Sequence, residues 1–538
     1  MKIILFLFVL ISITLKSQVE HVHVYHPVYD YLLRLETKGY LKHYSLSDLP
    51  MQRQDIIDIL TNVDSQTLSK TELKTHKLFL QEFEIIKNQN RVLIPSDTDS
   101  NQVFFEPLIG NDEKFFYKLQ GNNTVSIRPL ANLELRFSHQ DSSRNALLAN
   151  AGTRIYGTID NVLGYQLQVT NGSQLTGDKT LLTEDPRLGQ NVKFTVYDSD
   201  FDFTESHVRF QYDWFYAYVG RENRLVGSGL NQKLIISDLS TPFDAFSIGA
   251  KFKSFEYKHT HASLISLPLS TQTTGVDSEF IEKYLVIHRA SFRPSWGEIS
   301  IWEEITYTNR GMDIAYLNPL SFFKSLEHAL RDRDNSVMGF DFVIRPIKNL
   351  QLKGTYLLDD IIFEEIGNGF WSNKSAYNFS AISSMPLGFD LGFEYARNEP
   401  YVFSHFDNQQ SLTNDGILFA GYIPPNSEQF SILLQKWWGN RFPLKANFSY
   451  LRHGENVVID GNLIKNVGGD PLQTNRFEDS NTVTFLDGNL IEVFTGEFDF
   501  TFEIVRGFNL QLNYTLQKQA GSQLNQSGRI GIRFGEFR

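Results

Sequence analysis

From about residue 124 to the C-terminus, apolar and polar residues alternate with a period of two. In 509–516, NLQLNYTL, every second residue is apolar, and 497–504 and 444–450 repeat the pattern. Side chains along a β-strand point alternately to its two faces, so this period predicts strands with one apolar and one polar face. A soluble β-sandwich and a membrane β-barrel both show this alternation. The lengths of the strands and of their connections distinguish the two folds.

Strand and loop lengths favour a membrane barrel. The alternating segments run for about 9 to 16 residues, long enough to cross a bilayer when tilted, whereas soluble strands have about five or six. Tight turns at 294–297, 346–349, 385–387 and 506–507 alternate with long polar loops. This rhythm is typical of outer-membrane barrels, whose turns are periplasmic and whose loops face outward.

The pattern therefore predicts a mainly β fold, a transmembrane antiparallel β-barrel of about 18 strands with a small N-terminal α-helical domain. Closure pairs every strand edge, satisfies the backbone within lipid and leaves a polar lumen. An even number of strands places both barrel ends on the periplasmic side. The predicted strands, which rest on patchier alternation before residue 244, are 124–139, 152–160, 162–172, 205–213, 214–222, 244–252, 254–267, 283–294, 298–309, 336–345, 350–361, 374–385, 388–399, 429–437, 444–454, 489–505, 508–520 and 529–537.

Residues 1–17 have the pattern of a secretory signal peptide. One basic residue, Lys2, precedes an apolar run, and the segment reaches a small residue at Ser17. The run is short and is broken by polar residues, which argues against a membrane anchor helix. We therefore expect export, cleavage near Ser17, and a location in a Gram-negative outer membrane.

The region between this leader and the alternating segments has helical periodicity. Apolar residues recur on one face between Pro27 and Gly39, and Ser69 with Glu72 has the spacing of a capping box. We predict a small periplasmic helical domain. The expected organisation is a signal peptide at 1–17, the helical domain at 18–95, a connector at 96–123 and the barrel at 124–538.

Three histidines, His21, His23 and His26, stand close together after the predicted cleavage site. Imidazoles at this spacing could bind a metal ion. A segment just past a cleavage site is more often a mobile, solvated tail, and we favour this interpretation. We expect no metal and no cofactor.

The composition excludes several classes of protein. The chain has no cysteine in 538 residues, which rules out a disulfide scaffold, a thiolate nucleophile and a cysteine-ligated zinc site. Its formal net charge is -12, and nothing resembles the basic, aromatic-rich stripe that binds nucleic acid. The sequence has neither a Gly-x-Ser-x-Gly elbow nor a His-Glu-x-x-His, P-loop or dinucleotide motif. We expect a protein that is not an enzyme.

The stretch AYLNPLSFF, residues 315–323, interrupts the alternation. Asn318 and Pro319 break the chain, and 320–330 then has helical spacing. The segment falls in a long outward connection between two predicted strands. Two arrangements are open: the segment folds inward and narrows the pore, or it forms a surface helix that packs on neighbouring loops. A second irregularity is Glu303, which the alternation places on the lipid side without an evident reason.

Two stretches of the sequence resemble a known family. The run 288–361 resembles the capsule assembly Wzi family of Bacteroidota. The matching features are Arg310-Gly311, the run 315–320, Asp334-Asn335, Gly339 with Asp341, and 359–361. The run 220–246 is similar to a loop of that family with a Trp-Gly-Pro-Gly core, although Leu225 and Val226 stand where tryptophan is expected.

The resemblance implies an eighteen-stranded outer-membrane barrel with a periplasmic helical bundle. It implies a lectin that binds or anchors capsular or other surface polysaccharide and assists capsule assembly. The expected partners are the polysaccharide and outer-membrane lipid, with no nucleic acid, and the chain is expected to be a monomer. A porin or transporter for small solutes is the alternative function, since nothing in the sequence excludes an open lumen.

Polar donors and aromatic faces in the outward loops are the candidate sugar contacts, because saccharide recognition needs both. The alternative is that neighbouring opposite charges, as in 331–334, lock the loops together by ion pairs. Inside the barrel, Arg289, Arg293 and Arg345 share the polar face with Glu304 and Asp341, and we predict a bracing ladder of salt bridges. The candidate ligand-binding residues are Arg221, Arg224, Tyr316, Asn318, Phe322, Phe323, Arg331, Arg333 and Asn335.

Overall fold

A computed structural model describes residues 18–83, 116–120, 122–139, 143–194, 199–269, 280–331 and 333–535. The predicted signal peptide, 1–17, and most of the predicted connector, 96–123, lie outside the described residues. Among the described residues, no helix combines the length and the apolar composition needed to cross a membrane.

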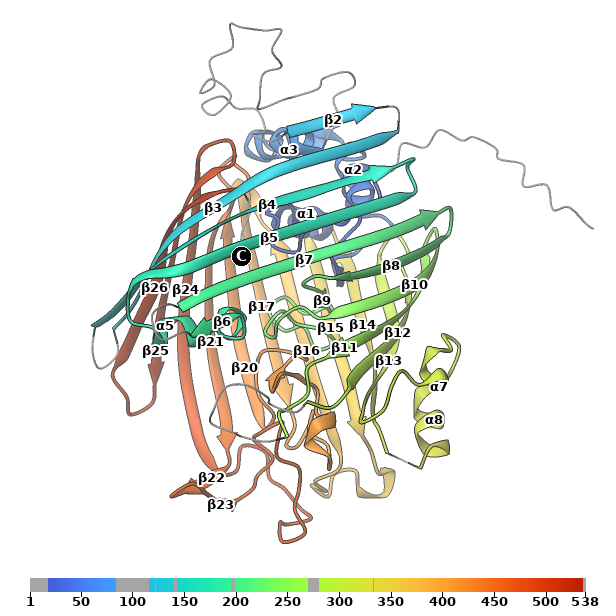
Figure 1. Ribbon diagram of the computed structural model, residues 1–538, viewed down its shortest axis with the longest axis vertical. Helices are drawn as coiled ribbons and strands as arrows, with labels where there is room; N and C mark the ends of the chain where they lie inside the picture. The colour runs from blue at the N-terminus through green and yellow to red at the C-terminus, as the bar shows by residue number, and fades with distance from the viewer. Residues whose placement is uncertain are drawn as a thin grey trace, which may run out of the picture.

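Eighteen antiparallel strands form a closed barrel, as the sequence predicts (Figure 1). β26 pairs with β3 from Gln526 opposite His139 to Phe534 opposite Ala131, and this pairing closes the ring. The barrel strands are β3 (Asn123–His139), β4 (Ser143–Ile159), β5 (Leu163–Gly177), β7 (Ser199–Tyr212), β8 (Phe215–Arg221), β10 (Asp244–Phe252), β11 (Phe255–Leu264), β12 (Lys283–Phe292), β13 (Gly297–Thr308), β14 (Asn335–Ile347), β15 (Leu350–Asp360), β16 (Lys374–Ser384), β17 (Phe389–Asn398), β20 (Ser427–Lys436), β21 (Leu444–Glu455), β24 (Asn489–Val505), β25 (Phe508–Gln519) and β26 (Leu524–Phe534).

Short strands accompany the barrel. β2 (Phe116–Gln120) pairs with β3, and β6 (Val192–Phe194) pairs with β7. β1 (Asp48–Leu49), between the first two helices of the N-terminal region, pairs with β9 (Leu225–Val226) in the connection after β8. Two further pairs each lie within one connection: β18 (Thr413–Asn414) with β19 (Ile417–Leu418), and β22 (Val457–Ile459) with β23 (Asn462–Lys465). Single turns of 3-10 helix are η2 (Phe363–Glu365), η3 (Pro386–Gly388) and η4 (Asn408–Gln410).

The strand predictions overlap all eighteen barrel strands, and the largest errors lie before residue 244. β4 begins at Ser143 rather than 152, β5 ends at Gly177 rather than 172, and β7 begins at Ser199 rather than 205. The missed ends contain Asn, Ser, Gly and Asp, which are depleted in strands. Pairing with long neighbouring strands holds these residues in the sheet despite their weak propensity.

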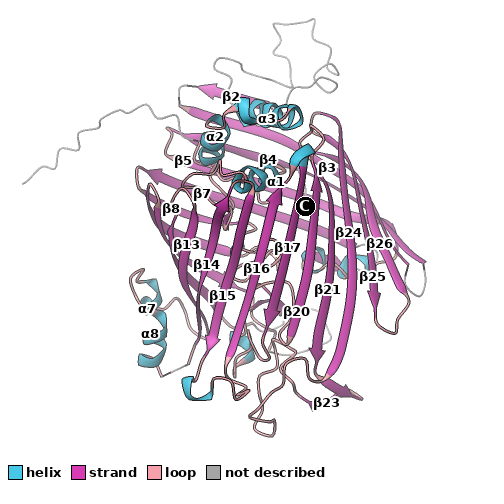
Figure 2. Cartoon of the chain, turned by 180° about the vertical axis from the view of Figure 1, so that it is seen from behind, coloured by secondary structure: helices cyan, strands magenta, loops and turns pink. Residues whose placement is uncertain are grey.

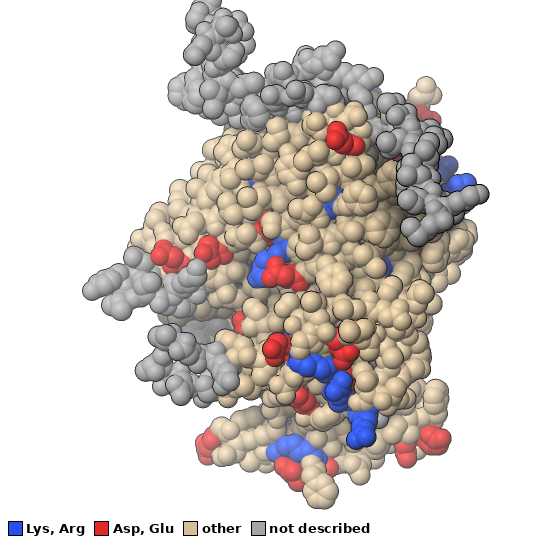
Figure 3. All heavy atoms as spheres, turned by 45° about the vertical axis from the view of Figure 1, so that its right-hand side comes forward, with Lys and Arg blue, Asp and Glu red and all other residues tan. Residues whose placement is uncertain are grey.

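The outer face of the barrel is an apolar belt and the inner face is polar. On the face that Figure 3 brings forward, charged side chains gather toward the lower end, and the wall above them is largely uncharged. Ile301, for example, is 64% exposed on the outside of β13. We call the end with the tight connections, such as 293–296 and 506–507, the turn end, and the opposite end the loop end.

A small helical domain sits in the turn end of the barrel (Figures 1 and 2). The predicted capping box is present, because Ser69 N donates to Glu72 Oε2 at 2.9 Å and Glu72 N donates to Ser69 Oγ at 3.3 Å. The apolar core of the helical domain includes Trp437, which belongs to the turn between β20 and β21. The helices are α1 (Val28–Thr37), α2 (Arg53–Thr61), the 3-10 turn η1 (Ser65–Thr67) and α3 (Lys70–Phe83).

Glu82, at the end of α3, fixes the helical domain to the barrel. Its carboxylate lies 2.7 Å from Arg441, 3.3 Å from Arg128 and 3.4 Å from Arg506, three residues of the barrel region, and 3.0 Å from His26. Burial would raise the pKa of Glu82, but Arg441, His26 and Arg506 hold it well below its ordinary value. Buried ion pairs between Glu82 and three arginines thus hold the helical domain against the barrel.

Three connections fold into the lumen and pack together as a plug. The first carries α5 (Thr180–Thr183) and α6 (Pro186–Gly189), and the other two are 222–243 and 399–426. Ser237 N donates to Phe419 O at 2.6 Å, and Gly421 N donates to Lys233 O at 2.8 Å. We call these three segments the plug. Its apolar core joins inward-facing residues of β10 to β16.

The segment 309–331 lies outside the barrel. Its two helices, α7 (Ile314–Leu317) and α8 (Phe323–Ala329), stand beside the wall in both ribbon views (Figures 1 and 2). Tyr316 and Phe323 form a buried cluster with Val286, Ile305 and Tyr307, outward-facing residues of β12 and β13. Both arrangements predicted from the sequence are therefore wrong: the segment neither enters the pore nor packs only on loops.

Candidate functional site

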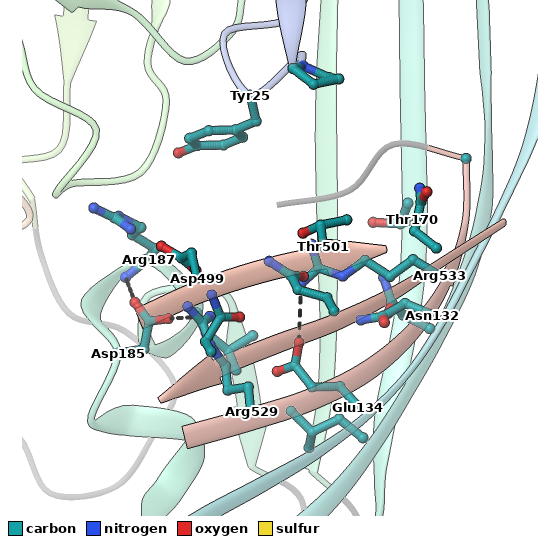
Figure 4. A pocket seen from close by; sticks show the side chains of 18 of the residues that line it. Tyr25, Asn132, Glu134, Thr170, Asp185, Arg187, Asp499, Thr501, Arg529 and Arg533 are labelled. Carbon is teal, nitrogen blue, oxygen red and sulfur yellow. Dashed lines mark hydrogen bonds and ion pairs between the residues drawn. The ribbon is translucent and has the colours of Figure 1, made fainter. Parts of the chain in front are cut away.

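A cavity of about 370 Å³ lies inside the barrel, between the wall, the plug and the helical domain (Figure 4). Its wall side is formed by inward-facing residues of β3 to β5 and β24 to β26. Tyr25 reaches toward it from the helical domain, opposite the strands that carry Glu134, Arg529 and Arg533. Three different parts of the chain thus meet around one cavity.

Amide side chains form one surface of this cavity. Asn509, Gln511 and Asn513 are successive inward residues of β25, and Asn132 of β3 lies near them. The side-chain carbonyl oxygens of all four are buried and have no hydrogen-bond partner within the described part of the chain. A buried carbonyl without a donor is unfavourable, so these four oxygens form a row that is ready to accept hydrogen bonds. We call them the amide row.

The charges around the cavity compensate one another. Glu134 of β3 accepts from Arg136 at 2.7 Å and from Arg533 at 3.2 Å. Asp185, at the start of α6, lies 3.8 Å from Arg136 and 3.7 Å from Arg529. The guanidinium groups are therefore held in fixed orientations by carboxylates, and the cavity is polar without a large excess of one charge.

Asp238 joins the helical domain to the plug beside the cavity. Its carboxylate accepts from Tyr25 at 2.5 Å, accepts from Tyr422, and lies 3.5 Å from Arg187. Burial would raise the pKa of Asp238, but Arg187 and the two tyrosine hydroxyls hold it below its ordinary value. These contacts keep Tyr25 and Arg187, both lining residues, in place.

Aromatic rings complete the lining. Phe201 and Phe203 of β7, Phe442 of the turn before β21, and Tyr25 all border the cavity. Amide acceptors, fixed guanidinium donors and aromatic faces in one concave space can bind a polyhydroxylated ligand, because hydroxyls pair with the polar groups and apolar faces pack on the rings.

The structure does not gather the nine predicted ligand residues into one site. Arg221 lies on the outward face at the end of β8 and pairs with Asp244 at 3.1 Å. Arg224 is buried, with its guanidinium 4.8 Å from the ring of Tyr218. Asn335 is also buried, where its Nδ2 donates to Gln410 O of the plug at 3.0 Å.

The other six predicted residues belong to the segment outside the barrel or to its end. Tyr316 and Phe323 are fully buried, and the Tyr316 hydroxyl donates to Asp334 at 2.6 Å. Asn318 accepts from Leu320 N at 3.1 Å and shapes the turn there. Phe322, Arg331 and Arg333 are exposed on this segment.

Sequence reasoning missed the amide row. Asn509, Gln511 and Asn513 lie on the polar face of a correctly predicted strand, but no role in ligand binding was predicted for them. The available signal was the composition of that face, which carries three amides in succession with no charge among them. Asn132 lies on β3, far from β25 in the sequence. Its position near the other three amides depends on the pairing of β26 with β3 that closes the barrel, which the sequence pattern does not show.

The N-terminal histidines pack against the rest of the protein, with His23 and His26 buried and His21 half-buried, and the prediction of a mobile, solvated tail is wrong. His23 lies 2.9 Å from Glu205 of β7, and His26 lies 3.0 Å from Glu82. His21 Nδ1 lies 2.7 Å from Glu222, at the start of the inward connection. The carboxylates that capture this segment come from distant parts of the chain, so local sequence could not indicate them.

His21, His207 and Glu222 bring three potential metal ligands within 4.8 Å of one another. Hydrogen bonds already engage part of this group: His207 Nε2 accepts from the backbone N–H of His21 at 3.1 Å, and His21 Nδ1 is hydrogen-bonded to Glu222 Oε1 at 2.7 Å. His207 Nδ1 lies 3.1 Å from the other oxygen of Glu222. Burial lowers the pKa of His21 to about 4, which leaves it neutral at physiological pH. The group acts as a hydrogen-bonded latch between the N-terminus and the wall.

The predicted ladder of lumen salt bridges is present in part. Arg289 lies 2.7 Å from Asp341 and 3.3 Å from Glu298, which also pairs with Arg293 at 3.2 Å. Arg345 instead donates to the backbone carbonyls of Leu41 and Ser295. Glu304 is not part of the ladder, because neither of its oxygens has a hydrogen-bond partner among the described residues.

No family model matches the chain, and no curated protein sequence matches it. Among solved structures, the chain is similar to Wzi of Escherichia coli, described as an outer-membrane protein involved in group 1 capsule assembly and as a carbohydrate-binding β-barrel. The two are 10% identical, with a TM-score of 0.57 and coverage of 97% of this chain and 100% of that chain. At this identity the likeness shows a shared fold.

Two further solved structures are less similar to this chain. OprD of Pseudomonas aeruginosa is 8% identical with a TM-score of 0.41, covering 76% of this chain and 94% of its own. OccAB4 of Acinetobacter baumannii is 10% identical with a TM-score of 0.44, covering 76% of this chain and 97% of its own.

Proposed function

We propose that this chain is an outer-membrane lectin that binds surface polysaccharide in the cavity of its barrel and holds it at the cell. The observation that carries the proposal is the amide row, whose four side chains line a cavity bordered by aromatic rings and whose carbonyl oxygens have no hydrogen-bond partner among the described residues. Sugar hydroxyls are suited to donate to such oxygens. The compensated charges around the row favour a sugar with little net charge.

The orientation belongs to the same proposal. The helical domain and the turn end face the periplasm, and the long connections face outward, as in other barrels with short turns on one side. A polysaccharide chain then enters from the loop end and contacts the amide row beside the plug. By retaining the chain, the protein assists assembly of the capsule or of another surface layer.

Binding by the amide row can be tested with shape-conserving substitutions. Asn509→Leu combined with Gln511→Leu removes two acceptors and keeps similar side-chain volumes. Each lost hydrogen bond weakens binding by about 0.5–1.5 kcal/mol, so the double variant binds oligosaccharides from the source cell's own surface polysaccharide about 5- to 150-fold more weakly. Gln66→Leu, at an exposed position of the helical domain, is the matched control. Unchanged affinity of the double variant in calorimetric titration refutes the site.

A channel for small solutes is the second candidate, because facing carboxylates and guanidinium groups such as Asp185 and Arg529 also suit a path for a polar solute. Gene deletion separates the two. Loss of the lectin releases polysaccharide into the medium and leaves solute uptake unchanged. Reduced solute uptake with normal cell-attached polysaccharide identifies a channel instead.

A further inference from the structure

The outer wall at β11 to β13 contains polar residues where a membrane-facing surface is otherwise apolar. His259, His288 and Glu303 stand directly opposite one another on these three strands. His288 Nε2 lies 2.7 Å from Glu303 Oε2. Ionisable side chains exposed to hydrocarbon are strongly unfavourable, so this part of the wall must be covered.

The segment 309–331 supplies the cover. The Phe323 ring stacks on His288 with 4.3 Å between ring centres, and Phe323 N donates to Glu303 Oε2 at 3.1 Å. Tyr257, on the outside of β11, donates its hydroxyl hydrogen to Pro319 O. These contacts fasten α8 and the turn before it to the outer wall, and they account for the position of Glu303 on the lipid side.

The register of the strands gives the depth of this segment. Tyr257, Ala290, Ile301 and Phe340 form one row across β11 to β14, because each is paired with the next. Ile301 and Phe340 in this row are exposed and belong to the apolar belt. Since Tyr257 reaches Pro319, the turn of the segment lies at the height of the belt rather than beyond the loop end.

The surface that the segment turns away from the wall is apolar. Ile314 is 83% exposed, Leu320 is 86% exposed and Phe322 is 54% exposed. Two cations of the segment are paired, Arg310 with Asp334 at 2.6 Å and Lys324 with Glu327 at 2.8 Å, whereas Arg331 is exposed at the end of the segment.

We propose that the segment 309–331 is a membrane-embedded element on the outside of the barrel, whose exposed apolar residues contact the acyl chains of the surrounding bilayer. The argument for lipid as the occupant is continuity: Leu320 follows Pro319, which is hydrogen-bonded to Tyr257 of the outer wall, and its exposed side chain extends the apolar surface that Ile301 and Phe340 form there. The segment also seals the polar residues of the wall from hydrocarbon. This inference rests on the transmembrane barrel and is independent of saccharide binding.

The chain has no cysteine, so single introduced cysteines can be labelled without background. The experiment attaches a nitroxide at Leu320→Cys and, separately, at Ile314→Cys, in the full chain reconstituted into phosphatidylcholine bilayers. Electron paramagnetic resonance then compares relaxation by oxygen, which concentrates in hydrocarbon, with relaxation by a water-soluble nickel chelate. Ile301→Cys is the hydrocarbon reference, and Asn462→Cys, in the exposed β22–β23 hairpin, is the aqueous reference.

The expected result is an oxygen-to-nickel accessibility ratio at Leu320 and Ile314 that is as high as at Ile301. A ratio equal to that of Asn462 overturns the proposal, because the segment would then be exposed to water, alone or as a docking surface for another protein. Both positions are exposed, so the substitutions leave the fold intact, and an intact barrel is verified by heat-modifiable migration in electrophoresis.

Discussion

Two long connections of this barrel, 222–243 and 309–331, both carry many apolar residues, yet the first lies inside the barrel and the second outside it. The first enters the lumen, where the carboxylate of Glu394 accepts hydrogen bonds from the backbone N–H groups of Leu230, Asn231 and Gln232. The second covers the outer wall, where Glu303 accepts from a backbone N–H group of α8. In both cases a carboxylate on a strand captures the backbone of a connection.

The difference between them lies in the face of the strand that carries the carboxylate. Glu394 stands at an inward position of β17, whereas Glu303 shares its face with Ile299 and Ile301. Apolar residues in a loop indicate that it packs against something, but they do not indicate the side of the wall. A polar residue that violates the strand alternation does indicate it. The irregular position of Glu303 was therefore the informative signal.

The largest effect is expected from breaking the inward connection. Glu394→Leu leaves three buried backbone N–H groups without an acceptor, at about 1–3 kcal/mol for each. The connection 222–243 should then leave the lumen, and single-channel conductance in planar bilayers should rise several-fold. Glu497→Leu, at an exposed inward position of β24, is the control and should conduct like the unmodified protein. Equal conductance of all three proteins would show that the connection does not close the pore.

A smaller effect is expected from breaking the outer contact. Phe323→Ala removes a fully buried ring that stacks on His288, and it should cost about 3–5 kcal/mol locally. α8 should detach from the wall while conductance stays unchanged, because the segment is outside the pore. Proteolysis between α7 and α8, detected by mass spectrometry, measures the detachment. Phe322→Ala, at the exposed neighbour, should remain resistant, and a conductance rise in Phe323→Ala would mean that the segment reaches the lumen.

Acid should loosen the inward connection through Asp238. The folded-state pKa of this carboxyl lies below its ordinary value of 3.8, so its contribution to stability is complete above that pH and is lost as pH falls through the folded-state pKa. Conductance should therefore increase below about pH 4. Asp238→Asn should conduct more at neutral pH and lose this acid-dependent step. A step that persists in Asp238→Asn would assign it to another group.

The smallest effect is expected at Arg333, which lies 3.5 Å from Asp313 and is half exposed. An exposed ion pair of this kind contributes about 0–1 kcal/mol, so Arg333→Ala should shift the midpoint of thermal unfolding very little. Circular dichroism during heating measures the shift. A large destabilisation would show that the outer segment depends on this pair more than its exposure indicates.

The sequence predicts the barrel well because alternation is a local property that repeats along every strand. The ends of β24 and β25 fall within one residue of prediction, since Arg506-Gly507 marks their turn. The paths of the connections could not be predicted, because they depend on contacts such as Asp238 with Tyr25 that join residues far apart in the chain. The candidate site was missed for the same reason.

The most direct test of the account compares polysaccharide retention by cells that carry cavity or outer-segment variants. Cells with Asn509→Leu and Gln511→Leu should release polysaccharide into the medium, while cells with Phe322→Ala and Arg333→Ala should keep it attached. Separate assays of cell-attached and released polysaccharide, at equal amounts of protein in the outer membrane, provide the measurement. Retention by the cavity variant together with release by the outer-segment variant would place the binding site outside the barrel and contradict the account.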